Sequence, residues 1–144
     1  MDDLWSRDGF QVSTDPARLD LDVMHGFLRT AYWSVNIPRD LVERAVAGSL
    51  NFGLYTAGEQ AGYARVVSDK ATFAWICDVF VLEPYRGRGL GRWLITCVMG
   101  HPELQGLRRW MLATADAQDL YRPFGFEVPD DPGRLMARRL PDTA

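Results

Sequence analysis

A turn that alternates arginine with glycine is the stretch whose residue types and spacing best suit binding chemistry. It follows an apolar, β-branched run over residues 75–82 and precedes apolar residues at helical spacing over 93–99. Glycine lets a backbone come close to a ligand. The first N–H groups of a helix have no partner within it and lie at the positive end of its dipole. A strand, this turn and a helix in succession therefore predict a phosphate site, to which arginines would add charge-assisted hydrogen bonds.

The spacing of the glycines indicates which phosphate ligand the turn fits. The order Arg86-Gly-Arg-Gly-Leu-Gly91 is not that of a Walker A loop, and it lacks the G-x-G-x-x-G register of a dinucleotide site. It resembles the R-G-x-G-[LI]-[GA] signature of the GCN5-related N-acetyltransferases (GNAT), in which this turn holds the pyrophosphate of acetyl-CoA. The alternative is an ordinary tight turn on a solvated face. The resemblance implies acetyl-CoA as co-substrate and these cofactor-binding residues: Arg86, Gly87, Arg88, Gly89, Leu90, Gly91 and Arg92.

A tyrosine in the C-terminal third is a candidate general acid. Tyr121 lies in Leu120-Tyr-Arg-Pro-Phe-Gly-Phe126, which resembles the L-Y-x-x-x-G-F segment of the same family. The resemblance implies that its hydroxyl protonates the departing thiolate of CoA. A phenol, with an ordinary pKa of about 10, is protonated at neutral pH and suits that task. The alternative is an aromatic side chain that packs a short helix onto the sheet.

Asp78 is the one charged residue within the apolar run that precedes the turn. Family members often carry an acidic residue at about this point, which takes the amine proton through water. Because Asp is one carbon shorter than Glu, a water relay would be needed here. The alternative role is a structural ion pair with an arginine such as Arg65 on the neighbouring predicted strand. The sequence leaves both roles open.

The end of the central strand is expected to contact the acyl donor through its backbone. By the same resemblance, the main chain at Phe80 and Val81 faces the pantetheine arm beside a bulge. Two positions depart from the family pattern. Pro84 stands one residue later than is usual, and Asp116 stands where the family often has Asn, so that we expect Asp116 to cap a helix instead.

The residues before the first hairpin are expected to select the acceptor. Tyr32, Trp33 and Asn36 fall between two predicted helices, where large aromatic side chains are less easily explained by core packing. We therefore predict that they bind the acceptor, a small-molecule or peptide amine. Ordinary core packing is the alternative for each aromatic residue.

Composition narrows the classes of protein to which the chain can belong. With 144 residues, 47% of them hydrophobic, the chain is long enough for one domain with a core. A net charge of −3 gives no electrostatic support for nucleic-acid binding. Cys77 and Cys97 fit neither a metal site nor a disulfide framework, so no metal is expected. The chain shows no apolar run of membrane-spanning length and no signal peptide, and we expect a cytoplasmic protein without membrane contact.

The order of predicted elements indicates an α/β fold of the GNAT type, with a mixed, mostly antiparallel central sheet flanked by helices on both faces. A single domain over 1–144 would divide into acceptor-side helices and a first strand (1–49), an acetyl-CoA-binding core (50–126) and C-terminal strands (127–144). Helices are expected at 16–30, 38–47, 90–99 and 116–121. Strands are expected at 10–14, 50–56, 61–67, 72–82, 109–114, 126–128 and 135–140.

These features together predict an acetyl-CoA-dependent N-acetyltransferase that transfers the acetyl group directly to a primary amine. Two alternatives remain: a non-catalytic CoA-binding regulatory module, and a transferase that uses another acyl-CoA. An exposed edge strand at the C-terminus would allow a homodimer.

Overall fold

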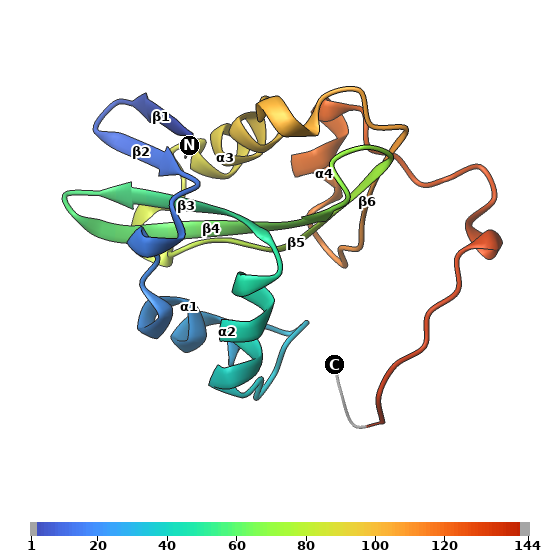
Figure 1. The fold of residues 1–144 in the computed structure, drawn as a ribbon, viewed down its shortest axis with the longest axis horizontal. Helices are drawn as coiled ribbons and strands as arrows, with labels where there is room; N and C mark the ends of the chain where they lie inside the picture. Colours follow the sequence, from blue (N-terminus) through green and yellow to red (C-terminus); the bar gives the residue numbers. More distant parts are fainter. Residues whose placement is uncertain (1–2, 142–144) are drawn as a thin grey trace.

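The protein is built around one twisted sheet of six strands, seen in a computed structural model that describes residues 3–141 (Figure 1). The strands follow one another in chain order across the sheet, and every pair is antiparallel except β5 with β6. This confirms the expected mixed, mostly antiparallel sheet. The strands are β1 (Leu4–Arg7), β2 (Phe10–Ser13), β3 (Leu50–Thr56), β4 (Glu59–Ser68), β5 (Phe73–Val81) and β6 (Arg109–Leu112).

Helices cover both faces of the sheet, as expected. Figure 1 shows α1 (Leu21–Leu28) and α2 (Arg39–Ala47) on one side and α3 (Leu90–Met99) on the other, with the short α4 (Gln118–Tyr121) beside β6. Each long helix presents an apolar stripe to the sheet, the arrangement by which most protein helices gain their stability. Within residues 3–141, no helix has the length and apolar character needed to cross a membrane.

The two faces of the sheet form two separate cores. On the α3 face, Phe52, Leu54 and Val66 pack with Leu94 and Val98. On the other face, a smaller cluster contains Met24 and Leu28 of α1, Val42 of α2, and Tyr63 and Phe80 of the sheet. The Tyr63 hydroxyl donates to the side-chain oxygen of Asn51, whose amide donates to the Val46 carbonyl at 2.9 Å. This buried chain of hydrogen bonds fixes the end of α2 onto the sheet.

A bulge in β5 reverses the faces of that strand halfway along it. Tyr63 pairs with Phe80 and Arg65 with Cys77, so Ala64 of β4 stands opposite two residues of β5, Asp78 and Val79. Asp78 is the extra residue and takes a left-handed φ of 55°. Before the bulge the even-numbered Ala74 and Ile76 face α3, and after it the odd-numbered Val79 and Val81 do. The bulge expected at this point from the family resemblance is therefore present.

The sheet has a gap along the edge of β5 that faces away from β4. β6 pairs only with the first half of β5, from Phe73 to Ile76. In the described part of the chain no strand continues the ladder beside residues 77–81 on that side. The chain after Leu112 instead turns away into α4. The backbone of β5 is therefore left open on one edge at the centre of the molecule.

The predicted C-terminal strands at 126–128 and 135–140 are wrong for the residues that the structure describes. The sheet ends at β6, and residues 127–141 run as an exposed tail with one 3₁₀ turn at Pro132–Arg134. Val128 and Met136 are 69% and 95% exposed, so the apolar residues behind the prediction bury little surface. The last three residues of the expected C-terminal region, 142–144, lie outside the described residues.

Three element boundaries also differ from the prediction. The strand β1 was not expected. The first predicted helix divides into a 3₁₀ turn at Pro16–Arg18 and α1, which begins at Leu21 because the Asp20 carboxylate accepts from the Val23 N–H at 3.2 Å. Asp116 does not cap α4, whose N-cap is Ala117 with no side-chain capping bond; the Thr114 hydroxyl accepts from the Ala117 N–H at 3.0 Å in the turn before the helix.

Candidate active site

The opening in the sheet continues into a cavity of about 640 Å³. Its walls come from four parts of the chain: the middle of β5, the chain from the end of β6 to α4, the loop between α1 and α2, and the C-terminal tail. The lining residues include both predicted catalytic residues, Asp78 and Tyr121, and two of the three predicted acceptor residues, Tyr32 and Trp33. The structure thus brings together residues that stand as far apart as 32 and 121 in the sequence.

Asp78 is held in the cavity wall by two hydrogen bonds. One carboxylate oxygen accepts from Nε of Arg65 at 2.8 Å, and the other accepts from the indole N–H of Trp33 at 3.0 Å. The side chains of Asp78 and Arg65 are only 14% and 19% exposed. The ion pair that the sequence left open is therefore present. Each oxygen keeps a further lone pair that could accept from water.

The bulge explains why Asp78 reaches the cavity. Without the extra residue, strand alternation would place Asp78 on the α3 face with Ile76, inside an apolar core. The left-handed φ at Asp78 turns it instead toward the α1–α2 face, where Arg65 and Trp33 supply hydrogen-bond donors. Asp is one of the few residues other than glycine that adopt this conformation readily.

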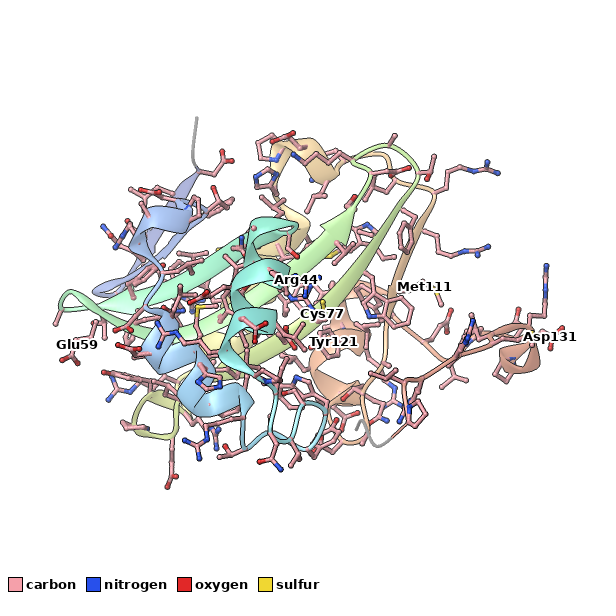
Figure 2. All side chains as sticks on the ribbon, turned by 60° about the horizontal axis from the view of Figure 1, so that its bottom comes forward. Arg44, Glu59, Cys77, Met111, Tyr121 and Asp131 are labelled. Atoms are coloured by element: carbon pink, nitrogen blue, oxygen red, sulfur yellow. The ribbon has the colours of Figure 1, made fainter. Side chains whose placement is uncertain are left out.

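Tyr121 lies at the C-terminal end of α4 with its ring buried. Burial raises the pKa of its hydroxyl to about 12, so the phenol stays protonated at neutral pH. Figure 2 shows Tyr121 and Cys77 together at the middle of the molecule, and both line the cavity. Its ring packs edge-on against Phe126 with centroids 5.9 Å apart. The packing role and a place at the cavity are therefore both present.

The loop between α1 and α2 spans the opening in the sheet. Trp33 bonds to Asp78 on β5, while the Tyr32 hydroxyl accepts from the Ala115 N–H on the far side at 3.0 Å. The two rings meet edge to face with centroids 5.1 Å apart. Asn36 does not line the cavity; it takes a left-handed φ of 60°, and its N–H donates to the Arg29 carbonyl at 2.8 Å. Its place in the structure is thus in the turn that shapes this loop.

The lining residues that sequence reasoning did not predict include two with functional side chains, Cys77 and Arg139. Cys77 points into the cavity from β5, and burial raises the pKa of its thiol to about 11; Cys97 is buried, and both thiols are free. Regular strand alternation would place Cys77 and Asp78 on opposite faces, so only the bulge, which brings both to the cavity, could have indicated Cys77. Arg139 enters from the C-terminal tail, and no sequence pattern links it to the cavity.

The arginine–glycine turn has the geometry expected of an anion site. Gly87 and Gly89 have φ of 82° and 73°, and Gly89 is the N-terminal cap of α3. The first helical hydrogen bond runs from Trp93 to Gly89. Within residues 3–141, the N–H groups from Gly87 to Arg92 donate to no protein acceptor, so they are free to bind an anion.

The side chains around this turn have different tasks. Those of Arg88 and Arg92 are exposed beside Gly91, whereas the Leu90 side chain is buried, so only the Leu90 backbone can face a ligand. Arg86 donates from Nε to the Val81 carbonyl at 2.7 Å, which braces the end of β5 against the turn.

The backbone of Phe80 borders this same strand end. Its ring is buried and stacks on Phe27 with centroids 4.2 Å apart, so only the main chain of Phe80 could contact a ligand. On the β4 side, a Cβ placed on Gly62 would lie 2.6 Å from the Phe80 carbonyl oxygen. Gly62 therefore sets how closely β4 approaches β5 at the point where the sheet opens.

Comparison with known proteins agrees with this architecture. The family model of the acetyltransferase (GNAT) domain matches residues 48–128. A protein of the fungus Gibberella zeae, provisionally named an acetyltransferase, is 33% identical over 140 residues, covering 81% of this chain and 78% of its own. A crystal structure from Xanthomonas campestris pv. campestris, provisionally assigned to the GNAT family, is 47% identical with a TM-score of 0.90, covering 94% of this chain and 96% of its own.

A more distant structure adds a bound ligand. A GNAT family acetyltransferase from Elizabethkingia anophelis, solved with acetyl-CoA bound, has a TM-score of 0.66 at 16% identity, covering 86% of this chain and 80% of its own. At that identity the likeness shows the fold alone.

The chain belongs to the GNAT acetyltransferase family, since the family model matches more than half of it. Membership confirms the resemblance that the arginine–glycine turn indicated. It also makes the protein an acyltransferase of a family whose co-substrate is acetyl-CoA.

Proposed function

We propose that this protein transfers the acetyl group of acetyl-CoA directly to a primary amine of a small molecule or peptide. The observation that supports this most is that Tyr121 and Asp78, a buried phenol and a carboxylate, line one cavity at the opening of the sheet. A proton donor and a proton acceptor are what acyl transfer from a thioester to an amine requires.

The acyl donor would be held at two places. The free N–H groups of residues 87–92 and the exposed arginines of the turn bind its pyrophosphate. The pantetheine arm lies along the open edge of β5, where the main chain at Phe80 and Val81 pairs with it as a neighbouring strand would. This placement delivers the thioester into the cavity beside Cys77 and Asp78.

The chemical step then follows from the residues around the thioester. The amine nitrogen attacks the carbonyl carbon and forms the C–N bond, while main-chain N–H groups at the bulge stabilise the oxyanion. As the C–S bond breaks, the Tyr121 hydroxyl gives its proton to the thiolate. A water molecule bonded to Asp78 receives the proton from the amine and passes it to the carboxylate. Solvent later restores the proton of Tyr121 and removes that of Asp78.

Replacement of Tyr121 tests this function. We expect Tyr121→Phe to lower kcat about a hundredfold, the usual range for a lost general acid, with little change in the affinity for acetyl-CoA. Release of free CoA thiol, measured over a panel of primary amines, reports kcat. Tyr55→Phe is the matched control, because Tyr55 is also a buried tyrosine but lies away from the cavity.

The outcomes separate the alternatives. Binding of acetyl-CoA without turnover of any amine would favour a non-catalytic CoA-binding module. Faster turnover with propionyl-CoA or a longer acyl-CoA would mean that the enzyme transfers that acyl group in place of acetyl. Unchanged kcat in Tyr121→Phe would remove the acid role of Tyr121 and leave the transferase activity in place.

A further inference from the structure

Two charged side chains of the cavity, those of Arg139 and Asp116, have no task in the proposed reaction. Arg139 lines the cavity, yet it comes from the exposed tail that follows α4. Figure 1 shows this tail leaving the body of the protein and bending back toward the side of α1 and α2. Arg138, its neighbour, does not line the cavity. A guanidinium carries hydrogen-bond donors and no acceptor, so Arg139 cannot act as a base.

The charges of the cavity explain what Arg139 could bind. Arg65 already neutralises Asp78 at 2.8 Å. The other charged lining residues are Asp116 and Arg139, and both are exposed. Neither forms an ion pair or hydrogen bond with another of the residues from 3 to 141. The cavity therefore offers one uncompensated carboxylate and one uncompensated guanidinium. An acceptor with an ammonium group alone would find a partner in Asp116 and repulsion from Arg139.

The uncharged part of the wall limits the body of the acceptor. Besides Tyr121, three aromatic side chains line the cavity, those of Tyr32, Trp33 and Trp75. Trp33 is fixed by its bond to Asp78 and Tyr32 by its bond to Ala115. Such rigid aromatic surfaces favour an apolar or flat molecule.

We propose that the acceptor is an amine that also carries an oxyanion group on an apolar or aromatic body, as an aromatic amino acid does, and that Arg139 binds this anionic group. The guanidinium fork matches the two oxygens of a carboxylate, and a phosphate offers the same chemistry. Asp116 would attract the ammonium end before it loses its proton. This inference rests on the proposed function and names the acceptor class for it.

Matched pairs of acceptors test the inference. Tryptophan with tryptamine, and phenylalanine with phenethylamine, differ by one carboxylate; O-phosphoethanolamine with ethanolamine tests phosphate as the source of charge. We expect kcat/KM to be at least about tenfold higher for the anionic member of a pair, the effect of one charge-assisted hydrogen bond. Arg139→Gln should remove that advantage by raising KM for the member with the oxyanion group, and it should not slow the amine-only member, which Arg139 repels. Arg139→Lys should restore part of it, and Arg138→Gln should behave as the wild type.

Each result decides the matter. Equal kcat/KM for both members of every pair, or an equal loss for both in Arg139→Gln, would overturn the inference and leave the N-acetyltransferase function standing. Absence of turnover with every amine, while acetyl-CoA binds, would overturn the proposed function and this inference with it. If only the phosphate pair showed the advantage, the oxyanion group of the acceptor would be a phosphate and not a carboxylate, and Arg139 would still be the residue that binds it.

Discussion

At the scale of single residues, the carboxylate of Asp78 has both of its oxygens engaged inside the protein. Arg65 and Trp33 each donate to one of them. The sequence identified Asp78 as a lone charge in an apolar strand and named Arg65 as its partner. It gave no sign of the bond to Trp33, because 45 residues separate the two in the chain. Only the fold shows that Trp33, in the loop between α1 and α2, and Asp78, the proposed base, belong to one hydrogen-bonded network.

Replacement of Asp78 by Asn should separate its two roles. Asn adopts left-handed backbone conformations, but it keeps only one acceptor oxygen and leaves the buried Arg65 charge unpaired, so we expect the fold to persist with a loss of about 3 kcal/mol. The amide cannot take a proton, and kcat should fall about a hundredfold. Urea unfolding and thiol release measure the two effects. A kcat close to that of the wild type would make Asp78 a positioning residue for Trp33.

The raised pKa of Tyr121 predicts a pH dependence of stability. The unfolded phenol ionises near pH 10, whereas the folded one does so at about 12. Between these values the folded state binds more protons, so the free energy of unfolding falls as pH rises. Tyr121→Phe lacks this contribution and should lose stability less steeply over the same window. Urea titrations at several pH values would show the difference, and parallel slopes would contradict it.

At the scale of elements, the close approach of β4 to β5 depends on Gly62. Because a Cβ there would lie 2.6 Å from the Phe80 carbonyl oxygen, Gly62→Ala must push two strands apart. We expect a loss of about 1–3 kcal/mol in unfolding free energy. Gly26→Ala is the control, since nothing lies within 4 Å of its Cβ in α1. That change should add about 0.5–1 kcal/mol. Equal stability of the two variants would contradict the steric argument.

The turn before α3 should show a cost in binding as well as in stability. Gly89 and Gly106 both have left-handed φ, 73° and 74°, with open space around a Cβ. Each change to Ala should cost about 1–2 kcal/mol of stability through backbone strain. Gly89→Ala should also weaken acetyl-CoA binding about tenfold by calorimetry, because it shifts the N–H groups that meet the pyrophosphate. An equal loss of affinity in Gly106→Ala would argue against this turn as the binding site.

The elements that sequence patterns predicted well are those whose burial is periodic. The strands β3 and β4, with the turn between them, and the helices α2 and α3 lie close to their expected ranges, because their apolar residues repeat at the spacing of a strand or a helix. β1 was missed because its burial is weak on both faces. The C-terminal strands were predicted from apolar residues that lack a partner surface. The arginine–glycine turn was predictable because its residues are contiguous. The cavity was predicted only in part, because its residues come from distant parts of the chain and their arrangement appears only in the fold.

At the scale of the whole molecule, the C-terminal tail over residues 127–141 lies outside the sheet and adds no strand to it. Residues 127–141 are exposed throughout, and the open outer edge of the sheet belongs to β6. Deletion of residues 130–144 should therefore change the free energy of unfolding by no more than about 0.5 kcal/mol. The same variant should lose selectivity for anionic acceptors as Arg139→Gln does. Chemical denaturation tests the first expectation; a large loss of stability would mean that the tail supports the core.

Because of the bulge, the side chains of β5 alternate between the two faces of the sheet in one order before Asp78 and in the reverse order after it. Before Asp78 the even-numbered residues face α3, and after it the odd-numbered residues do. A designer who applied one hydrophobic pattern to the whole strand would therefore bury polar groups on one half of it. If the bulge were straightened with residue 78 kept, the two environments beyond it would exchange, with Phe80 turned toward α3 and Val79 and Val81 turned toward α1. Removal of residue 78 would instead leave each of them on its present face. The inserted residue thus puts two successive side chains, those of Cys77 and Asp78, on the face of the cavity, which regular alternation does not allow.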